Sequence, residues 1–141
     1  MKNKLNCVML IDDDEATNFL HQIVVKETGC TRHVKTACGA KEALNYLHRS
    51  SQHESTDCPV PDLIFLDLNM PGMNGWEFLA MYEGLDTGAK KKPTIVMLTT
   101  SLDPDDAVRA HTFPEVAAFE GKPCTNEMID KILVKYFPDN I

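Results

Sequence analysis

The sequence predicts an α/β domain built around a mainly parallel β-sheet. Five short apolar runs alternate along the chain with five segments of helical periodicity, which is typical of a parallel sheet covered by helices. The length of 141 residues suits one domain with a conventional hydrophobic core. We therefore expect a single domain over residues 1–141, with its core at about residues 6–136.

The apolar runs are the candidate strands. They are Cys7–Ile11, His33–Ala37, Leu63–Leu66, Thr94–Leu98 and Val116–Phe119. The first, third and fourth runs are almost wholly apolar, as expected for strands that helices cover on both faces. The second run contains Lys35 and Thr36 and the fifth is short, so we expect these two strands near the edges of the sheet.

The segments between the runs are predicted to be helices because their apolar residues recur at spacings of three and four. The first helix is predicted between an N-cap at Asp14 and a stop at Gly29. Its apolar stripe is predicted to face the core and comprises Ala16, Phe19, Leu20, Ile23 and Val24. The stripes of the other four helices fall within residues 40–47, 78–82, 107–110 and 128–136. The polar segment His48–Pro61 has no such period and is predicted to be a loop insertion.

The charge and the cysteines exclude several classes of protein. Fourteen basic and 21 acidic side chains give a net charge of −7, which disfavours a nucleic acid or an anionic membrane surface as a partner. No apolar run approaches the roughly 18 residues of a membrane span. The five cysteines are odd in number and widely spaced, as in proteins of a reducing compartment. We therefore expect a cytoplasmic protein.

Polar residues follow four of the five predicted strands. Asp12 and Asp13 follow the first, Asp67 the third, Thr99 the fourth and Lys122 the fifth. Ligands of open parallel sheets bind just beyond the carboxyl ends of the strands, where these side chains are expected to gather. An aspartate pair after a strand is commonly only a helix cap, but clustered carboxylates repel one another unless a cation joins them. Oxygen ligands favour Mg²⁺, which we expect near Lys122.

Four segments carry a resemblance to a known family. They are VMLIDDDE, PDLIFLDLNMPGMNGWEFL, PTIVMLTTS and FEGKPCT. Together they resemble the response-regulator receiver domains of two-component signalling, over nearly the whole chain from about Asn6 to Tyr136. The resemblance implies a flavodoxin-like, doubly wound fold with five parallel strands in the order 2-1-3-4-5 and helices on both faces.

The same resemblance implies a role for each matching residue. Asp67 is the expected phosphoacceptor. Asp13 is expected to bind Mg²⁺ directly and Asp12 through a bound water, while the backbone carbonyl of Asn69 completes the protein ligands. Lys122 is expected to contact the phosphoryl group.

The resemblance further implies a switch. Thr99 is the expected switch hydroxyl and Phe119 occupies the position of the switch aromatic, although it lacks the hydroxyl group of a tyrosine. Phosphorylation would then alter a surface formed by the fourth helix, the fifth strand and the fifth helix. The Lys122–Pro123 peptide bond is expected to be cis. The five histidines show no metal-ligand spacing, and none is assigned a role.

The expected partners also follow from the resemblance. A sensor histidine kinase or a histidine phosphotransfer protein would supply the phosphoryl group, and a downstream protein target would read it. Only five residues follow Tyr136, so we expect a stand-alone receiver that is a monomer or a weak phosphorylation-dependent dimer. Such a chain is not an enzyme for other substrates. A phosphorelay intermediate without its own output remains an alternative.

Two other classes of protein share features with this sequence, either an aspartate nucleophile with Mg²⁺ and a lysine or the same order of strands. A phosphatase of the haloacid-dehalogenase type has a second aspartate two residues after its nucleophile, where this chain has Asn69. A flavodoxin-like FMN carrier would hold phosphate on a loop rich in serine, threonine and glycine. Here the loop after the first strand is Asp12–Glu15, which is wholly acidic and repels phosphate in the absence of a metal.

Overall fold

The computed structural model describes residues 3–84 and 92–140 and contains one five-stranded parallel sheet in the order β2-β1-β3-β4-β5. The strands are β1 (Leu5–Ile11), β2 (Thr31–Ala37), β3 (Leu63–Asp67), β4 (Thr94–Thr99) and β5 (Val116–Gly121). The helices are α1 (Glu15–Thr28), α2 (Ala40–Gln52), α3 (Gly75–Glu83), α4 (Pro104–Ala110) and α5 (Asn126–Tyr136), followed by a short 3₁₀ helix, η1 (Pro138–Asn140). The predicted fold is confirmed.

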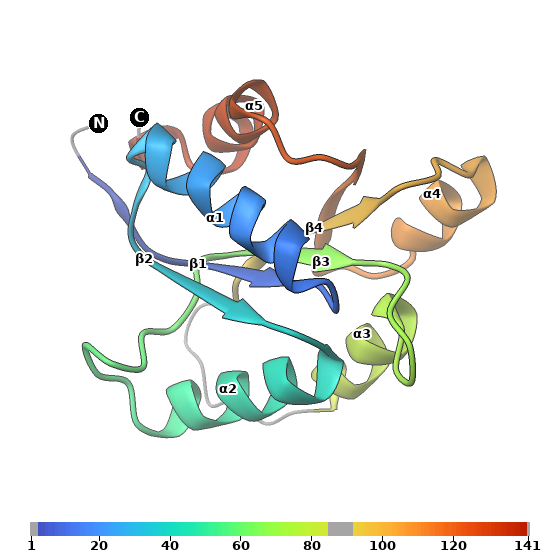
Figure 1. Ribbon diagram of the computed structural model, residues 1–141, viewed down its shortest axis with the longest axis horizontal. Coiled ribbons are helices and arrows are strands. Elements are labelled where there is room, and N and C mark those ends of the chain that lie inside the picture. The colour runs from blue at the N-terminus through green and yellow to red at the C-terminus, as the bar shows by residue number, and fades with distance from the viewer. Residues whose placement is uncertain (1–2, 85–91, 141) are drawn as a thin grey trace.

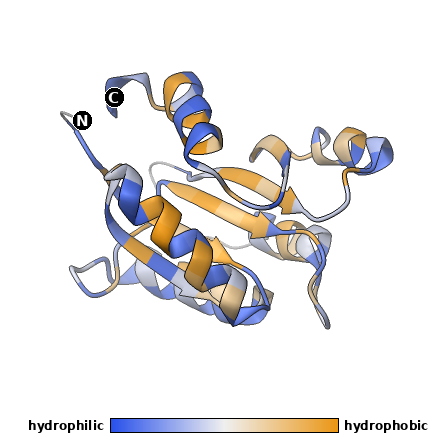
Figure 2. Cartoon of the chain, turned by 45° about the horizontal axis from the view of Figure 1, so that its top comes forward, coloured by the Kyte–Doolittle hydropathy of each residue, from blue (hydrophilic) through white to orange (hydrophobic). Residues whose placement is uncertain are grey.

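Helices cover both faces of the sheet (Figure 1). Alternate strand residues feed two apolar clusters, because successive side chains of a strand point to opposite faces. Met9 and Ile64 belong to the cluster beneath α2 and α3, whereas Leu10 and Phe65 belong to the cluster beneath α1 and α5. The central strands are accordingly the most apolar part of the chain (Figure 2). The helices cover the two faces of the sheet, so polar groups collect at the carboxyl-terminal end of the sheet.

All five predicted strands form, and β2 and β5 are the edge strands as expected. Each strand is one or two residues longer than its apolar run. As a result Asp67 and Thr99 are the last residues of β3 and β4, so the sheet itself positions both side chains.

Helix α1 begins and ends where the sequence predicts. The carboxylate of Asp14 accepts a hydrogen bond from the Ala16 N–H, and Gly29 ends the helix in the left-handed conformation with φ of 66°. A glycine adopts this conformation without the steric cost that a side chain would add.

The predicted buried face of α1 is wrong. Phe19 and Leu20 are 64% and 61% exposed, and Ile23 is also exposed. The helix instead buries Asn18, His21 and Val25. Its inner face can carry polar side chains because they form hydrogen bonds with main-chain groups of neighbouring loops.

The predicted loop His48–Pro61 is wrong at its start, because α2 continues through Gln52. Ser50 is buried at the position where the apolar stripe would continue, and its hydroxyl donates to the Leu47 carbonyl oxygen. A small polar residue therefore takes the place of an apolar one on the inner face of α2, and the apolar periodicity that predicts a helix is interrupted there. The loop begins at His53.

Within the described ranges 3–84 and 92–140, none of the helices combines the length and the apolar character that crossing a membrane requires.

Candidate functional site

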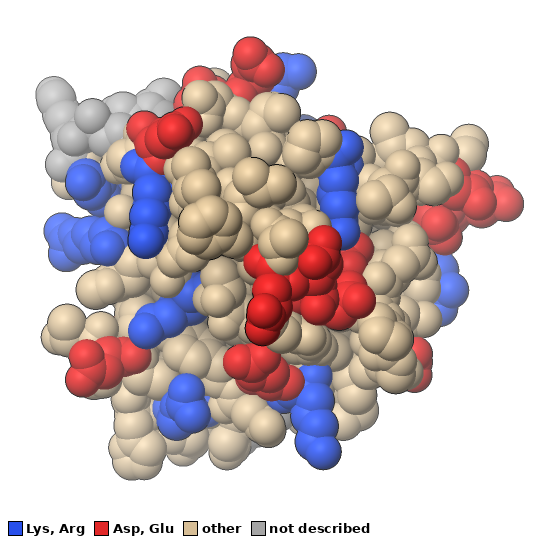
Figure 3. Space-filling view, viewed as in Figure 1, with Lys and Arg blue, Asp and Glu red and all other residues tan. Residues whose placement is uncertain are grey.

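Three carboxylates meet at the carboxyl ends of β1 and β3. Asp12 and Asp13 follow β1 directly and Asp67 ends β3, and these strands are paired in register up to Ile11 and Leu66. One carboxylate oxygen from each aspartate lies within 4.8 Å of the others. Asp12 and Asp67 are buried, whereas Asp13 is exposed. Acidic side chains gather on the molecular surface where β1 leads into α1 (Figure 3).

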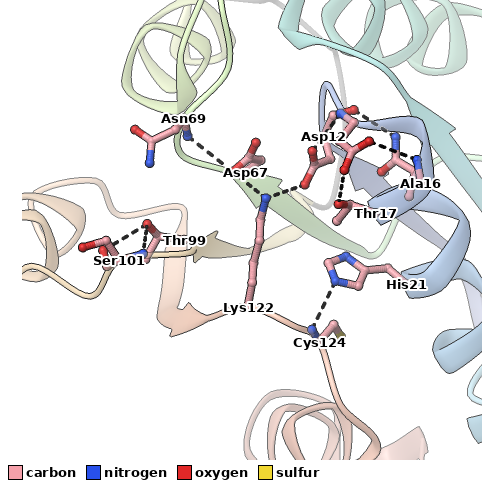
Figure 4. Close-up of polar contacts among 12 residues, drawn as sticks. Asp12, Ala16, Thr17, His21, Asp67, Asn69, Thr99, Ser101, Lys122 and Cys124 are labelled. Atoms are coloured by element: carbon pink, nitrogen blue, oxygen red, sulfur yellow. Dashed lines mark hydrogen bonds and ion pairs between the residues drawn. The ribbon is translucent and has the colours of Figure 1, made fainter.

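Lys122 connects two of these carboxylates. Its Nζ lies 2.6 Å from Oδ2 of Asp12 and 3.0 Å from Oδ1 of Asp67 (Figure 4). Its main-chain N–H donates to the carbonyl oxygen of Thr99 at 2.8 Å, which fixes the end of β5 against β4. Burial opposes the charge of Lys122, but the hydrogen bonds to Asp12 and Asp67 raise its pKa above the ordinary value. The side chain is therefore an ammonium group at neutral pH.

Asp67 is held in a setting that opposes its negative charge. Burial raises the pKa of Asp67 to about 6, although the hydrogen bond from Lys122 acts in the opposite direction. The Asn69 N–H also donates to Oδ1 of Asp67, at 3.3 Å. A second positive charge at this point would favour the ionised carboxylate further.

The raised pKa of Asp67 predicts a pH dependence. In protein free of Mg²⁺ the Asp67 carboxyl signal should titrate near pH 6, and added Mg²⁺ should lower the midpoint. The folded-state pKa exceeds the unfolded value of about 4. Protonation of Asp67 therefore adds to the free energy of unfolding. This contribution is complete below about pH 4 and is lost as the pH rises through about 6. NMR titration of the aspartate carboxyl carbons measures the midpoint. A midpoint near 4 without Mg²⁺ would contradict this account.

The loop after Asp67 is fixed by local geometry. The Gly75 N–H donates to the Leu68 carbonyl oxygen at 2.8 Å, and Asn74 and Glu77 form a capping box at the start of α3. A Cβ atom on Gly75 would lie only 3.0 Å from the main-chain oxygen of Asp67. A side chain at position 75 would therefore require a shift of a few tenths of an ångström, and glycine lets α3 begin this close to β3 without it.

The two predicted switch residues lie on neighbouring strands, β4 and β5. Thr99 is buried, and its hydroxyl is hydrogen-bonded to the N–H and the carbonyl oxygen of Ser101, as Figure 4 shows. Phe119 is half-buried and packs against the cluster beneath α3. Phe119 also lines a groove of about 390 Å³ with residues of α4 and α5. Both residues lie near the carboxyl ends of their strands, and their role in a switch stays a prediction.

Sequence reasoning missed two polar residues beside the site. Asn18 Nδ2 donates to the carbonyl oxygens of Asp12 and Ala37, at 2.9 and 3.1 Å. His21 Nε2 accepts a hydrogen bond from the Cys124 N–H at 3.2 Å (Figure 4). The available signal was their spacing of three residues, which places both on one face of the predicted helix.

The cis bond expected between Lys122 and Pro123 is present.

The chain is similar in sequence and in fold to several known proteins. Residues 8–133 match the model of the response regulator receiver domain. The chain is 30% identical over 109 residues to response regulator Rcp1 of Synechocystis sp., covering 77% of this chain and 71% of Rcp1. It is 29% identical to a probable methanogenesis regulatory protein, FilR2, of Methanothrix harundinacea, covering 74% of this chain and 64% of FilR2. A crystal structure of a two-component response regulator from Cytophaga hutchinsonii superposes with a TM-score of 0.85 at 29% identity, covering 94% of this chain and 97% of that one.

Proposed function

This chain belongs to the response regulator receiver domain family, whose members accept phosphoryl groups in two-component signalling, and we propose that Asp67 is its phosphoacceptor. One observation carries the proposal. The buried Asp67 carboxylate touches the Lys122 ammonium group and shares an acidic cluster with Asp12 and Asp13. A carboxylate nucleophile, a fixed cation and further oxygen ligands thus meet at the end of one strand.

The proposed reaction is transfer from a phosphohistidine of a sensor histidine kinase or a histidine phosphotransfer protein. A carboxylate oxygen of Asp67 attacks the phosphorus atom, and the P–N bond breaks with its electron pair passing to the imidazole nitrogen. The P–N bond is labile, so the site has mainly to position the reactants and to offset charge on the transferred group. Lys122 is already held beside Asp67 by two ion pairs within the site and would contact the phosphoryl oxygens.

The donor set fits Mg²⁺. Three carboxylate oxygens lie within 4.8 Å of one another, and oxygen ligands supplemented by water are what this ion prefers. We assign Asp13 and Asp67 as direct ligands, Asp12 as a ligand through water, and the main-chain carbonyl of Asn69 as the remaining protein ligand. When bound, Mg²⁺ supplies positive charge that offsets the anionic phosphoryl group.

The proposed output uses Thr99 and Phe119. A phosphoryl oxygen on Asp67 offers the Thr99 hydroxyl a stronger acceptor than its present partner, the Ser101 main chain. Movement of Thr99 would leave space into which the half-buried Phe119 ring could turn. The groove that Phe119 shares with α4 and α5 would then change shape, and a downstream protein would recognise the altered surface.

The proposed function is tested by treating the purified chain with phosphoramidate and Mg²⁺. Intact-protein mass spectrometry should show the gain of one phosphoryl group, which peptide mapping should locate on Asp67. The gain should disappear when a chelator removes Mg²⁺. Absence of any adduct with phosphoramidate, acetyl phosphate and a phosphorylated histidine phosphotransfer protein would overturn the proposal.

A further inference from the structure

The inner face of α1 carries two buried polar side chains that contact the two halves of the site. Asn18 bonds the main chain of Asp12 on one side, and His21 bonds the main chain of Cys124 on the other. Both side chains are 3% exposed. A buried polar side chain costs free energy unless it is hydrogen-bonded, so these two bonds are part of what fixes the position of α1.

We propose that His21 is a positioning residue for Lys122, acting through the main chain of Cys124. Its Nε2 anchors the turn that follows Lys122, and so keeps Nζ of Lys122 between Asp12 and Asp67. The inference rests on the proposed function, because that function gives Lys122 its contact with the phosphoryl group.

The turn from β5 to α5 has few main-chain anchors. The Lys122 N–H is bonded to Thr99 of β4, and Pro123 has no N–H to donate. The Cys124 N–H is bonded to His21, after which Thr125 caps α5. His21 therefore holds the point between the end of the strand and the start of the helix.

The hydrogen bond also defines the state of the His21 ring. Because Nε2 accepts the Cys124 N–H, the imidazole is neutral and carries its proton on Nδ1. Burial lowers the pKa of His21, and the nearby Lys122 ammonium group acts in the same direction, so the neutral form is favoured although Asp12 opposes it. A side chain that lacks an acceptor at this position would leave the buried Cys124 N–H without a partner.

Helix α1 thereby links the two partners of one ion pair. Asn18 holds the carbonyl oxygen of Asp12, and His21 holds the second residue after Lys122, three positions further along the same helix face. Across that span Nζ of Lys122 reaches Oδ2 of Asp12 at 2.6 Å. A shift in the turn after Lys122 would lengthen this contact together with the contact to Asp67.

The test compares three variants with the wild-type chain. His21→Leu removes the acceptor and keeps an apolar side chain of similar size. His21→Gln restores an acceptor at about the position of Nε2. Val25→Ala is the matched control, because it weakens the core on the same face of α1 but removes no hydrogen bond to the turn. Thermal melts rank the stability of all three, and His21→Ser, which is too short to reach the amide, replaces His21→Leu if that variant does not fold.

Two measurements are made on each variant. NMR follows the Cys124 amide and the Lys122 ammonium group without phosphorylation, and mass spectrometry follows the rate of phosphoryl gain from phosphoramidate with Mg²⁺. In His21→Leu both sets of signals should move, and the maximal rate should fall on the order of tenfold because a displaced contact group loses its orientation. His21→Gln should recover most of the rate. Val25→Ala should leave the Lys122 signals unchanged.

Unchanged Lys122 signals in His21→Leu would overturn the inference, as would an equal loss of rate in His21→Leu and Val25→Ala. The proposed function fails separately. If the wild-type chain gains no phosphoryl group, the assignment of Asp67 is wrong, and the NMR comparison still decides whether His21 positions Lys122.

Discussion

Asp67→Asn should abolish phosphoryl gain from phosphoramidate and Mg²⁺, because the amide that replaces the carboxylate is not a nucleophile. The substitution keeps the shape of the side chain at the end of β3. It also removes a buried negative charge that the fold disfavours, as the raised pKa of Asp67 shows. We therefore expect a folded protein whose free energy of unfolding in the absence of Mg²⁺ is not reduced. Intact-protein mass spectrometry over a time course measures the loss.

The matched control for this variant is Asp14→Asn. It makes the same chemical change two residues from Asp12, and asparagine caps a helix about as well as aspartate. The Asp14 side chain lies at the exposed start of α1 and bonds the Ala16 N–H and the Thr17 hydroxyl, so it takes no part in the cluster. Asp14→Asn should gain phosphate at close to the wild-type rate. If the Asp67→Asn variant gained a phosphoryl group on another residue at close to the wild-type rate, the assignment of Asp67 as the nucleophile would be refuted.

Asp13→Asn should weaken Mg²⁺ binding by about 10- to 100-fold, the loss expected when a charged ligand or its close support is removed. Asp13 is exposed, so the change should leave the fold intact. Isothermal titration calorimetry at a fixed ionic strength measures the affinity. The rate of phosphoryl gain at limiting Mg²⁺ should fall in parallel, and saturating Mg²⁺ should restore part of it.

Glu15→Gln separates ligation from general electrostatic attraction. It removes one negative charge from the exposed first turn of α1, outside the carboxylate cluster. A solvent-exposed charge that does not bind the ion is weakened by salt screening, so the expected loss of Mg²⁺ affinity is smaller than in Asp13→Asn. Equal losses in Glu15→Gln and Asp13→Asn would mean that Asp13 attracts the ion without binding it.

The fold and most of the site could be predicted because the end of a strand indicates both where a secondary-structure element lies and which residues are candidates for the site. An apolar run indicates a strand covered on both faces, and the first polar residue after it lies at the carboxyl end of that strand, where ligands bind. Asp67 and Thr99 follow such runs directly, so one observation located both the element and the candidate group.

The remaining features could not be predicted because they invert the usual relation between polarity and exposure. Helix α1 places Phe19 and Leu20 in solvent and Asn18 and His21 inside, so its apolar stripe indicated the wrong face. The periodicity of a sequence reports which side chains are apolar. It does not report which main-chain groups of distant loops lie within reach of a buried polar side chain. The partners of Asn18 and His21 are set by tertiary structure.

Gly75 shows how a residue without a side chain can constrain this site. A Cβ placed there would lie 3.0 Å from each of three atoms, which are the Asp67 carbonyl oxygen, the Leu68 Cα and the Met97 Cε. Asp67 ends β3 and Leu68 follows it, and main-chain atoms at this point move aside less readily than the flexible end of the Met97 side chain. A larger residue at position 75 would therefore shift α3 or the end of β3 by a few tenths of an ångström, beside the proposed phosphoacceptor Asp67. We expect substitutions at position 75 to slow phosphoryl gain on Asp67, although glycine has no side chain with which to bind a metal or a phosphoryl group.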